Sequence, residues 1–186
     1  MRYQRGISMI EVLITCLVLA VGLLGIAVFQ SKSTVGSLES YQRAQAIILL
    51  EDMSARLQGN PKNAGNYLVN LAGTGDARPD DCSGVAAGAE RDLCEWSAAL
   101  KGASELANGN SKVGAMIGAR GCVTQVQAEN RVDGACVPAI YQISVVWQGM
   151  HETIAPADTC GKGLYGGEGN RRAIGAQVTI PLLDCQ

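Results

Sequence analysis

Residues 7–29 read ISMIEVLITCLVLAVGLLGIAVF, and 18 of these 23 residues are apolar. The other 163 residues contain 70 apolar side chains, or 43%, which is ordinary for a globular domain. The positive mean hydropathy of the chain, +0.12, therefore comes from one segment. At about 1.5 Å per residue, a helix of this length would span about 35 Å, enough to cross a bilayer core of about 30 Å.

A short polar leader, residues 1–6, precedes this segment and carries Arg2 and Arg5. Cationic residues ahead of a spanning helix hold that end in the cytoplasm, so we expect the rest of the chain outside. The apolar run is longer than that of a cleaved secretory signal, and Phe29-Gln30-Ser31-Lys32 fits the small-residue cleavage site poorly. These features alone predict an uncleaved signal anchor.

Glu11 lies inside the apolar run. A carboxylate in hydrocarbon costs about 2.5–3.5 kcal/mol at a helix centre and less near an end, so such a residue normally has a partner. Gly6, at the junction, leaves the backbone open to a protease. Cleavage after Gly6 would create a cation, the amino group of Ile7, about 6 Å from Glu11 along a helix axis. This pair would form within one chain or with a neighbouring parallel helix, where it would set the axial register.

The sequence Arg5-Gly6 followed by Ile7-Ser8-Met9-Ile10-Glu11-Val12-Leu13 resembles the N-terminus of type IV pilins and related pseudopilins. The resemblance implies cleavage between Gly6 and Ile7 by prepilin peptidase, N-methylation of Ile7, and a role for Glu11 in assembly. Ile7 departs from the phenylalanine or methionine that is commoner at this position.

Further features are similar to the PilV family of minor pilins: residues 8–13 with 19–25, Trp147-Gln148-Gly149, and a cysteine-rich C-terminal part. This resemblance implies a minor pilin of the type IV pilus that serves assembly, twitching motility and surface attachment. The implied partners are other minor pilins, the major pilin, a tip-associated adhesin, prepilin peptidase and the inner-membrane assembly platform. The implied location is the inner membrane, with the head periplasmic, and later the pilus at or near its tip. A type II secretion pseudopilin remains an alternative, because its leader is the same.

Residues 30–58 are expected to continue the helix as an amphipathic segment. Polar Gln42, Arg43, Glu51, Asp52 and Arg56 would form one face, and Gly59 suits a left-handed cap before Pro61. The chain thus divides into a leader (1–6), a membrane or filament-core helix (7–29), its amphipathic continuation (30–58) and a head (59–186). The apolar face would consist of Val35, Leu38, Tyr41, Ala44, Ile47, Ile48, Leu50, Met53 and Leu57.

The seven cysteines divide into Cys16, read as a small residue of the apolar core, and six in residues 59–186. An even number in an exported segment indicates three disulfides, and the spacing does not suit zinc. Sequence leaves about 15 pairings open. Because each would close a local loop, we expect sequential pairing: Cys82 with Cys94, Cys122 with Cys136, and Cys160 with Cys185.

The head is expected to contain a short helix within residues 88–106 and strands near 121–128, 137–149 and 176–180, with a loop over 150–172. In residues 137–149, alternation places Tyr141, Ile143, Val145 and Trp147 on one face. The predicted fold class is α+β: a long N-terminal helix packed on a disulfide-rich antiparallel sheet of three to five strands. This matches the pilin-like fold that the resemblance implies.

Other function classes find little support in the sequence. A net charge of −2 and 4% aromatic residues make a nucleic-acid surface unlikely. His151-Glu152 does not extend to a zinc-protease motif, and Asp80-Asp81 resembles a solvated pair, so we predict no catalytic residue, metal or cofactor. A signal-anchored periplasmic enzyme is the alternative. A tip ligand or DNA module, built on Arg171-Arg172 with Lys162 and Tyr165, is another.

Overall fold

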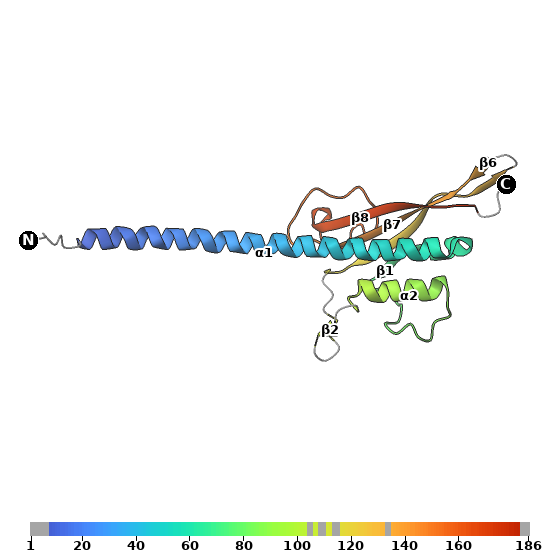
Figure 1. Cartoon of the computed structure of the whole chain (residues 1–186), viewed down its shortest axis with the longest axis horizontal. Helices are drawn as coiled ribbons and strands as arrows, with labels where there is room; N and C mark the ends of the chain where they lie inside the picture. The colour runs from blue at the N-terminus through green and yellow to red at the C-terminus, as the bar shows by residue number, and fades with distance from the viewer. Residues whose placement is uncertain (1–7, 104–105, 108–110, 113–115, 133–134, 183–186) are drawn as a thin grey trace, which may run out of the picture. The chain divides into compact units, whose positions relative to one another are not determined.

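The computed structural model describes the chain except residues 1–7, 104–105, 108–110, 113–115, 133–134 and 183–186. The chain divides into two compact units, Met1–Ser40 and Tyr41–Gln186. The ribbon in Figure 1 follows these elements along the chain. They are the α-helices α1 (Met9–Gly59) and α2 (Ala89–Leu100), the 3-10 helices η1 (Pro61–Tyr67) and η2 (Glu168–Asn170), and the strands β1 (Val69–Gly73), β2 (Leu106–Ala107), β3 (Ser111–Lys112), β4 (Arg120–Gln127), β5 (Asn130–Val132), β6 (Ala135–Val137), β7 (Ala139–Gln148) and β8 (Arg171–Ile180).

The described part of the first unit is helical from Met9 onward and belongs to α1. No charged residue occurs between Glu11 and Lys32. Among the described residues, α1 is the one helix long and apolar enough to cross a membrane, and none of its most apolar stretch is buried. The described residues of this unit therefore form a single helix with no buried core.

In the second unit, the remaining residues of α1 bury one face, but it differs from the predicted face. Leu50, Met53 and Leu57 are buried as expected. Tyr41 and Ile48 were expected in the same face but are 43% and 57% exposed. The helix has apolar residues on two sides, and only the side shared with Leu50 meets the head. Gln42, expected on the polar face, is buried instead. The full buried set is Gln42, Ala46, Leu49, Leu50, Met53 and Leu57.

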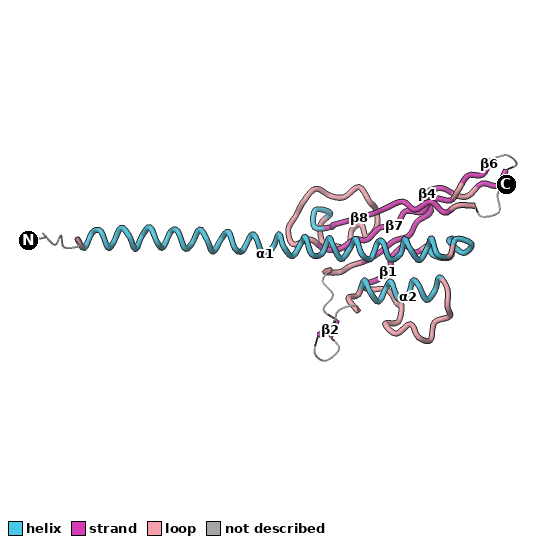
Figure 2. The backbone as a smooth tube through the Cα atoms, in the orientation of Figure 1, coloured by secondary structure: helices cyan, strands magenta, loops and turns pink. Residues whose placement is uncertain are grey.

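A four-stranded antiparallel sheet in the order β1-β4-β7-β8 forms the centre of the second unit (Figure 2). Two small two-stranded pairs, β2 with β3 and β5 with β6, stand apart from it. The alternation predicted for β7 is confirmed, because Tyr141, Ile143, Val145 and Trp147 all join the main core. The α+β architecture of a long helix with an antiparallel sheet and disulfides is thus the one that the sequence predicted.

Trp96 of α2 connects the two helices to the sheet. Its side chain is fully buried, and its indole Nε1 donates a hydrogen bond to the carbonyl of Leu49 in α1 at 2.8 Å. The ring lies directly on Gly121 of β4, where a Cβ would fall 2.0 Å from a ring carbon. Arg56 adds ion pairs from α1 to Asp92 (2.9 Å) and to Glu95 of α2. The two helices therefore cover one face of the sheet together.

The short helix expected within 88–106 is confirmed as α2, which ends at Leu100, where Lys101 forms the C-cap. Other local expectations need correction. Strand β8 begins at Arg171, so the loop expected over 150–172 ends earlier. Strand β1 was not predicted, because five residues with small Gly and Ala members carry little alternation. Gly59 does not have a positive φ. Helix α1 ends instead with a hydrogen bond from the Asn60 N–H to the carbonyl of Leu57, three residues earlier, and the 3-10 helix η1 begins at Pro61.

We predict that Gly121→Ala destabilises the second unit without changing its topology. The backbone at Gly121 accepts an L-residue, so the cost is the clash with the buried Trp96 ring. Overpacking of this kind is expected to lower the free energy of unfolding by about 3 kcal/mol, and the Tm by about 10 °C. Circular dichroism melting of the full chain in non-ionic detergent measures it.

The matched control is Gly84→Ala, because nothing lies within 4 Å of the added Cβ there. The control is expected to melt within about 0.5 kcal/mol of the natural chain. Equal Tm values for the two variants would contradict the role given to the Trp96 contact.

Candidate functional site

The N-terminal segment is the first candidate site. Gly6 and Ile7, the predicted cleavage and methylation residues, lie outside the described residues. Helix α1 begins just after them, and Glu11 lies in its first turn. The backbone N–H of Glu11 donates to the Ser8 carbonyl at 3.0 Å. An acidic side chain in this position also favours the helix, because its charge complements the positive end of the helix dipole.

The surface that follows Glu11 is almost entirely apolar. Exposed fractions reach 70% at Leu13, 68% at Leu24 and 72% at Phe29. The Thr15 hydroxyl donates to the Val12 carbonyl at 2.9 Å, so this polar group is satisfied within the helix. Exposed apolar surface of this extent marks contact with a membrane or with other proteins. Cys16 is exposed here with a free thiol, consistent with a small residue on an apolar surface.

The disulfides of the second unit match the prediction at one pair and correct it at another. Cys82 pairs with Cys94 as expected. Cys122 pairs with Cys160, which overturns the expected partners Cys136 and Cys185. Cys136 lies in the β5–β6 hairpin, beyond the end of β4, and extended strand carries it out of disulfide range of Cys122. Cys136 is itself disulfide-bonded, and Cys185 lies outside the described residues.

The Cys122–Cys160 bond fastens the loop between β7 and β8 to the face of the sheet opposite α1. Tyr165 and Val146 pack with this disulfide in a second, smaller core. Ser144 donates a hydrogen bond to Asp158 beneath the same loop. The loop therefore buries polar Ser144, which lies on the face of β7 opposite Tyr141 and Ile143.

Arg171 is buried beneath that loop and stabilises it, and it is not part of a basic surface patch. Its side chain is 2% exposed and forms an ion pair with Glu168 at 2.8 Å. It also donates to the carbonyls of Pro156, Asp158 and Cys160. Arg172 donates to the carbonyls of Gly169 and His151, and the Tyr165 hydroxyl donates to that of Gly118. Because Arg171 is buried, this geometry overturns both its interpretation as a solvated loop residue and the alternative that used it as a contact for a ligand or DNA.

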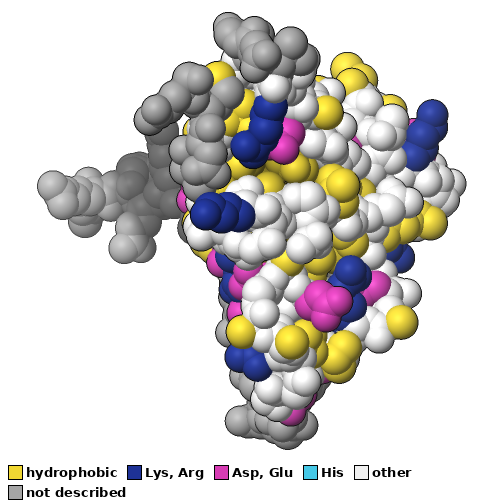
Figure 3. Space-filling view, turned by 90° about the vertical axis from the view of Figure 1, so that its right-hand side faces the viewer, with side chains coloured by type: hydrophobic (Ala, Val, Ile, Leu, Met, Phe, Trp, Pro, Cys, Tyr) yellow, Lys and Arg dark blue, Asp and Glu magenta, His cyan; other side chains and the backbone are white. Residues whose placement is uncertain are grey.

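Charge elsewhere on the second unit is mixed. On the face in Figure 3, acidic and basic side chains are interspersed among apolar and polar ones, and no broad patch of one sign is seen. Among the described residues, no three His, Cys, Asp or Glu side chains come together as metal ligands would.

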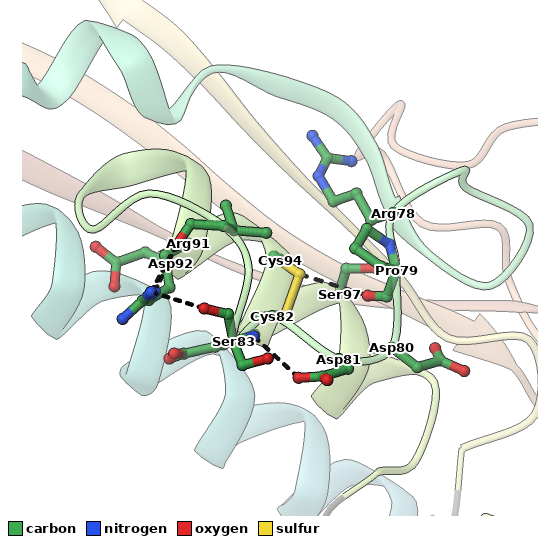
Figure 4. Close-up of a disulfide and its surroundings, with 12 residues drawn as sticks. Arg78, Pro79, Asp80, Asp81, Cys82, Ser83, Arg91, Asp92, Cys94 and Ser97 are labelled. Carbon is green, nitrogen blue, oxygen red and sulfur yellow. Dashed lines mark hydrogen bonds between the residues drawn. A yellow bond between two sulfur atoms is a disulfide. The ribbon is translucent and has the colours of Figure 1, made fainter.

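The Cys82–Cys94 disulfide holds the loop between β1 and α2 (Figure 4). Arg91 of α2 donates to the carbonyls of Ser83 and Val85, and the Ser83 N–H donates to Asp81. The Cys94 sulfur lies 3.4 Å from the Pro79 carbonyl oxygen. The Asp81 carboxylate thus accepts a hydrogen bond from the backbone of its own loop.

Asp76 anchors the start of the same loop. Its side chain is 8% exposed, and it pairs with Lys101 at 2.6 Å and Arg78 at 3.1 Å. It accepts further hydrogen bonds from the Ser97 hydroxyl at 2.7 Å and the Gly73 N–H at 3.1 Å. Burial by itself raises the pKa of Asp76, but these donors outweigh it and lower the pKa from 3.8 to about 2. Sequence did not single out Asp76, because nothing in its local pattern shows that four donors converge on it.

Comparison with known proteins identifies one match, at the N-terminus. The model of the prokaryotic N-terminal methylation motif matches residues 1–27. The chain is therefore prepilin-like, of the kind found in type IV pilus or type II secretion systems. No match was found among curated proteins. None was found among solved structures either.

We predict that Asp76→Asn removes a pH-dependent contribution to stability. Because folding lowers this pKa, the contribution is present above about pH 4 and is lost as the pH falls toward about 2. The variant is expected to be less stable by about 2 kcal/mol near neutral pH, and the difference should shrink below about pH 4. Denaturant unfolding of both proteins across this pH range measures it.

The control is Glu90→Gln, which removes an exposed carboxylate from the first turn of nearby α2. If the difference in the free energy of unfolding between Asp76→Asn and the natural chain stays constant down to about pH 2, the lowered pKa of Asp76 is contradicted.

Proposed function

We propose that this chain is a minor pilin of a type IV pilus, similar to the PilV family. Prepilin peptidase cleaves it between Gly6 and Ile7 in the inner membrane, and Ile7 becomes N-methylated. The chain then leaves the membrane to join other minor pilins and the major pilin, at or near the tip beside an adhesin. In this role it primes or modifies assembly and so serves twitching motility and surface attachment.

The observation that carries the proposal is α1 itself. The methylation motif covers residues 1–27, and α1 begins at Met9 and continues without a break to Gly59. None of its most apolar stretch is buried within the described chain. Such a surface suits lipid before assembly and the helices of neighbouring subunits afterwards, because both environments accept apolar side chains without directional requirements.

The second apolar side of α1 adds to this support. Tyr41 and Ile48 are exposed within the second unit, although the opposite side of the same helix is buried in the core. Apolar side chains left on the outside of a packed helix suit a further layer of protein. Neighbouring pilin subunits are that layer in this proposal.

A structural role is favoured over an anchored enzyme, because the polar clusters of the second unit fasten loops. Asp76, Arg91 and Arg171 each use their hydrogen bonds on nearby backbone or charged partners. A type II secretion pseudopilin shares the leader and the helix, and it is the second candidate. The disulfides favour the pilus over the secretion system, because the cysteine-rich head resembles that of the PilV family of minor pilins.

Mass spectrometry of sheared pili tests the processing and the location together. We expect a chain that starts at N-methylated Ile7, with the six residues of the leader missing. The control is the membrane fraction of a strain without prepilin peptidase, which should retain the chain from Met1. Absence of the chain from sheared pili, with processed chain present in a secretion-system preparation, would favour the pseudopilin instead.

We further predict that Glu11→Ala blocks incorporation but not membrane insertion. The Glu11 carboxylate would pair with the Ile7 amine of a neighbouring subunit and set the axial register of the helices. Immunoblots are expected to show normal amounts of the variant in membranes and at least about a tenfold loss from sheared pili, about 1.4 kcal/mol if incorporation is at equilibrium.

Glu51→Ala is the matched control, because it removes an exposed carboxylate from the same helix far from the motif. Normal incorporation of Glu11→Ala would refute the register role while leaving cleavage at Gly6 untouched.

A further inference from the structure

Strand β8 is an unprotected edge of the four-stranded sheet. It lies at the end of the order β1-β4-β7-β8 and pairs with β7 through ten consecutive residue pairs. Among the described residues, no main-chain group hydrogen-bonds to the outer side of Ala173–Ile180. An edge strand of this length presents a row of unpaired N–H and C=O groups to any extended chain that reaches it.

The outward groups can be assigned from the ladder. Gly149 N–H donates to the Asn170 carbonyl, so that pair faces inward, toward the β7–β8 seam. Inward and outward residues alternate along an antiparallel pair, and the β7–β8 register has no bulge. The backbone groups of four residues therefore point away from β7. These residues are Ala173, Gly175, Gln177 and Thr179.

Sheet edges are normally blocked by charge, proline, a bulge or short length. The opposite edge, β1, has two of these devices, since it is five residues long and its register shifts between Val69 and Ala72. Residues 173–180, by contrast, contain no charge and no proline, and Pro181 follows only where the strand ends. The open edge is thus about 27 Å long.

The side chains of this edge define what would pair with it. On the side facing the main core, Val178 and Ile180 are buried, but Ile174 and Ala176 are only partly buried. On the other side, Gly175, Gln177 and Thr179 are exposed and uncharged. A strand added here would place apolar side chains beside Ile174 and Ala176 and small polar ones beside Gln177.

We propose that the outer edge of β8 binds an extended segment of a partner protein by strand addition. The segment has about six to eight uncharged residues with apolar side chains at alternate positions. Backbone hydrogen bonds to the four outward residues supply the affinity, and the side-chain alternation fixes the register.

A second copy of this chain is a poorer occupant. If two copies paired through β8 and kept their main cores on the same face of the combined sheet, the two β8 strands would have to run antiparallel. Residues 41–59 of α1 in the two copies would then point in opposite directions. Chains anchored in one membrane through α1 share a single direction. This exclusion rests on the proposed function, whereas the open edge itself does not.

The test uses the full chain in dodecyl maltoside and a synthetic peptide of alternating valine and threonine, flanked by lysines. Hydrogen exchange resolved by residue is the readout. Without peptide, the outward amides of Gly175, Gln177 and Thr179 should exchange rapidly. Saturating peptide should slow them at least about tenfold, while the inward amides of Ala176 and Val178 change little because β7 already binds them.

A peptide with N-methyl groups on two adjacent central residues loses a donor from each edge and serves as the control ligand. Equal protection by both peptides, or no protection by either, would overturn the proposal. A different outcome is that the outward amides already exchange slowly without peptide, with a protection that increases with protein concentration. That result would show that a second copy of this chain occupies the edge, and it would overturn the proposal of a partner segment.

Gln177→Pro removes one outward N–H without removing a bond to β7, and Gln177→Ala keeps that N–H. We expect at least about tenfold weaker peptide binding for the proline variant and unchanged binding for the alanine variant. If Gln177→Pro does not fold, Gln177→Lys tests the same edge through charge. If the natural chain does not bind the peptide but N-methylated Ile7 is found in pili, the strand addition alone is refuted. If the natural chain binds the peptide but is absent from pili, the proposed function alone is refuted.

Discussion

The contact between the Trp96 ring and Gly121 is the constraint on which the second unit depends. The ring reaches the backbone of β4 only because residue 121 lacks a side chain, and its indole N–H is then satisfied by the Leu49 carbonyl. One side chain thereby joins α1, α2 and the sheet, and burial of the rest of the core follows from their approach. An unsatisfied indole N–H in that position would cost about 1–3 kcal/mol, so the hydrogen bond and the packing must form together.

How far sequence predicts this fold depends on whether the determining partners are local. The alternation in β7 was readable, because Tyr141, Ile143 and Val145 all meet one continuous core. In α1, the apolar residues lie on two sides, so periodicity alone could not separate Ile48, which is exposed, from Leu49, which is buried. Burial there is decided by the position of Trp96 and the sheet, distant in sequence.

The same reasoning explains the outcome at the candidate sites. The N-terminal motif is contiguous, so the prediction of Gly6, Ile7 and Glu11 rests on sequence alone and stays a prediction. Cys160 pairs with Cys122 across 38 residues because the loop after β7 folds back over the sheet. The burial of Arg171 has the same origin, since the carbonyls that surround it belong to that loop. Neither result follows from local pattern. The first changes the predicted disulfide partners, and the second removes Arg171 from the residues that the sequence offered for ligand or DNA binding.

The apolar helix and the open β8 edge differ in what they demand of a neighbour. Apolar burial is roughly proportional to area and is non-directional, so a helix such as Met9–Phe29 accepts lipid or any similar helix. Strand addition is directional, and a shift of one residue would turn every apolar side chain of the added strand to the wrong face. The helix therefore suits entry into a shared apolar core, whereas the strand addition proposed for residues 173–180 would let the chain discriminate among neighbours.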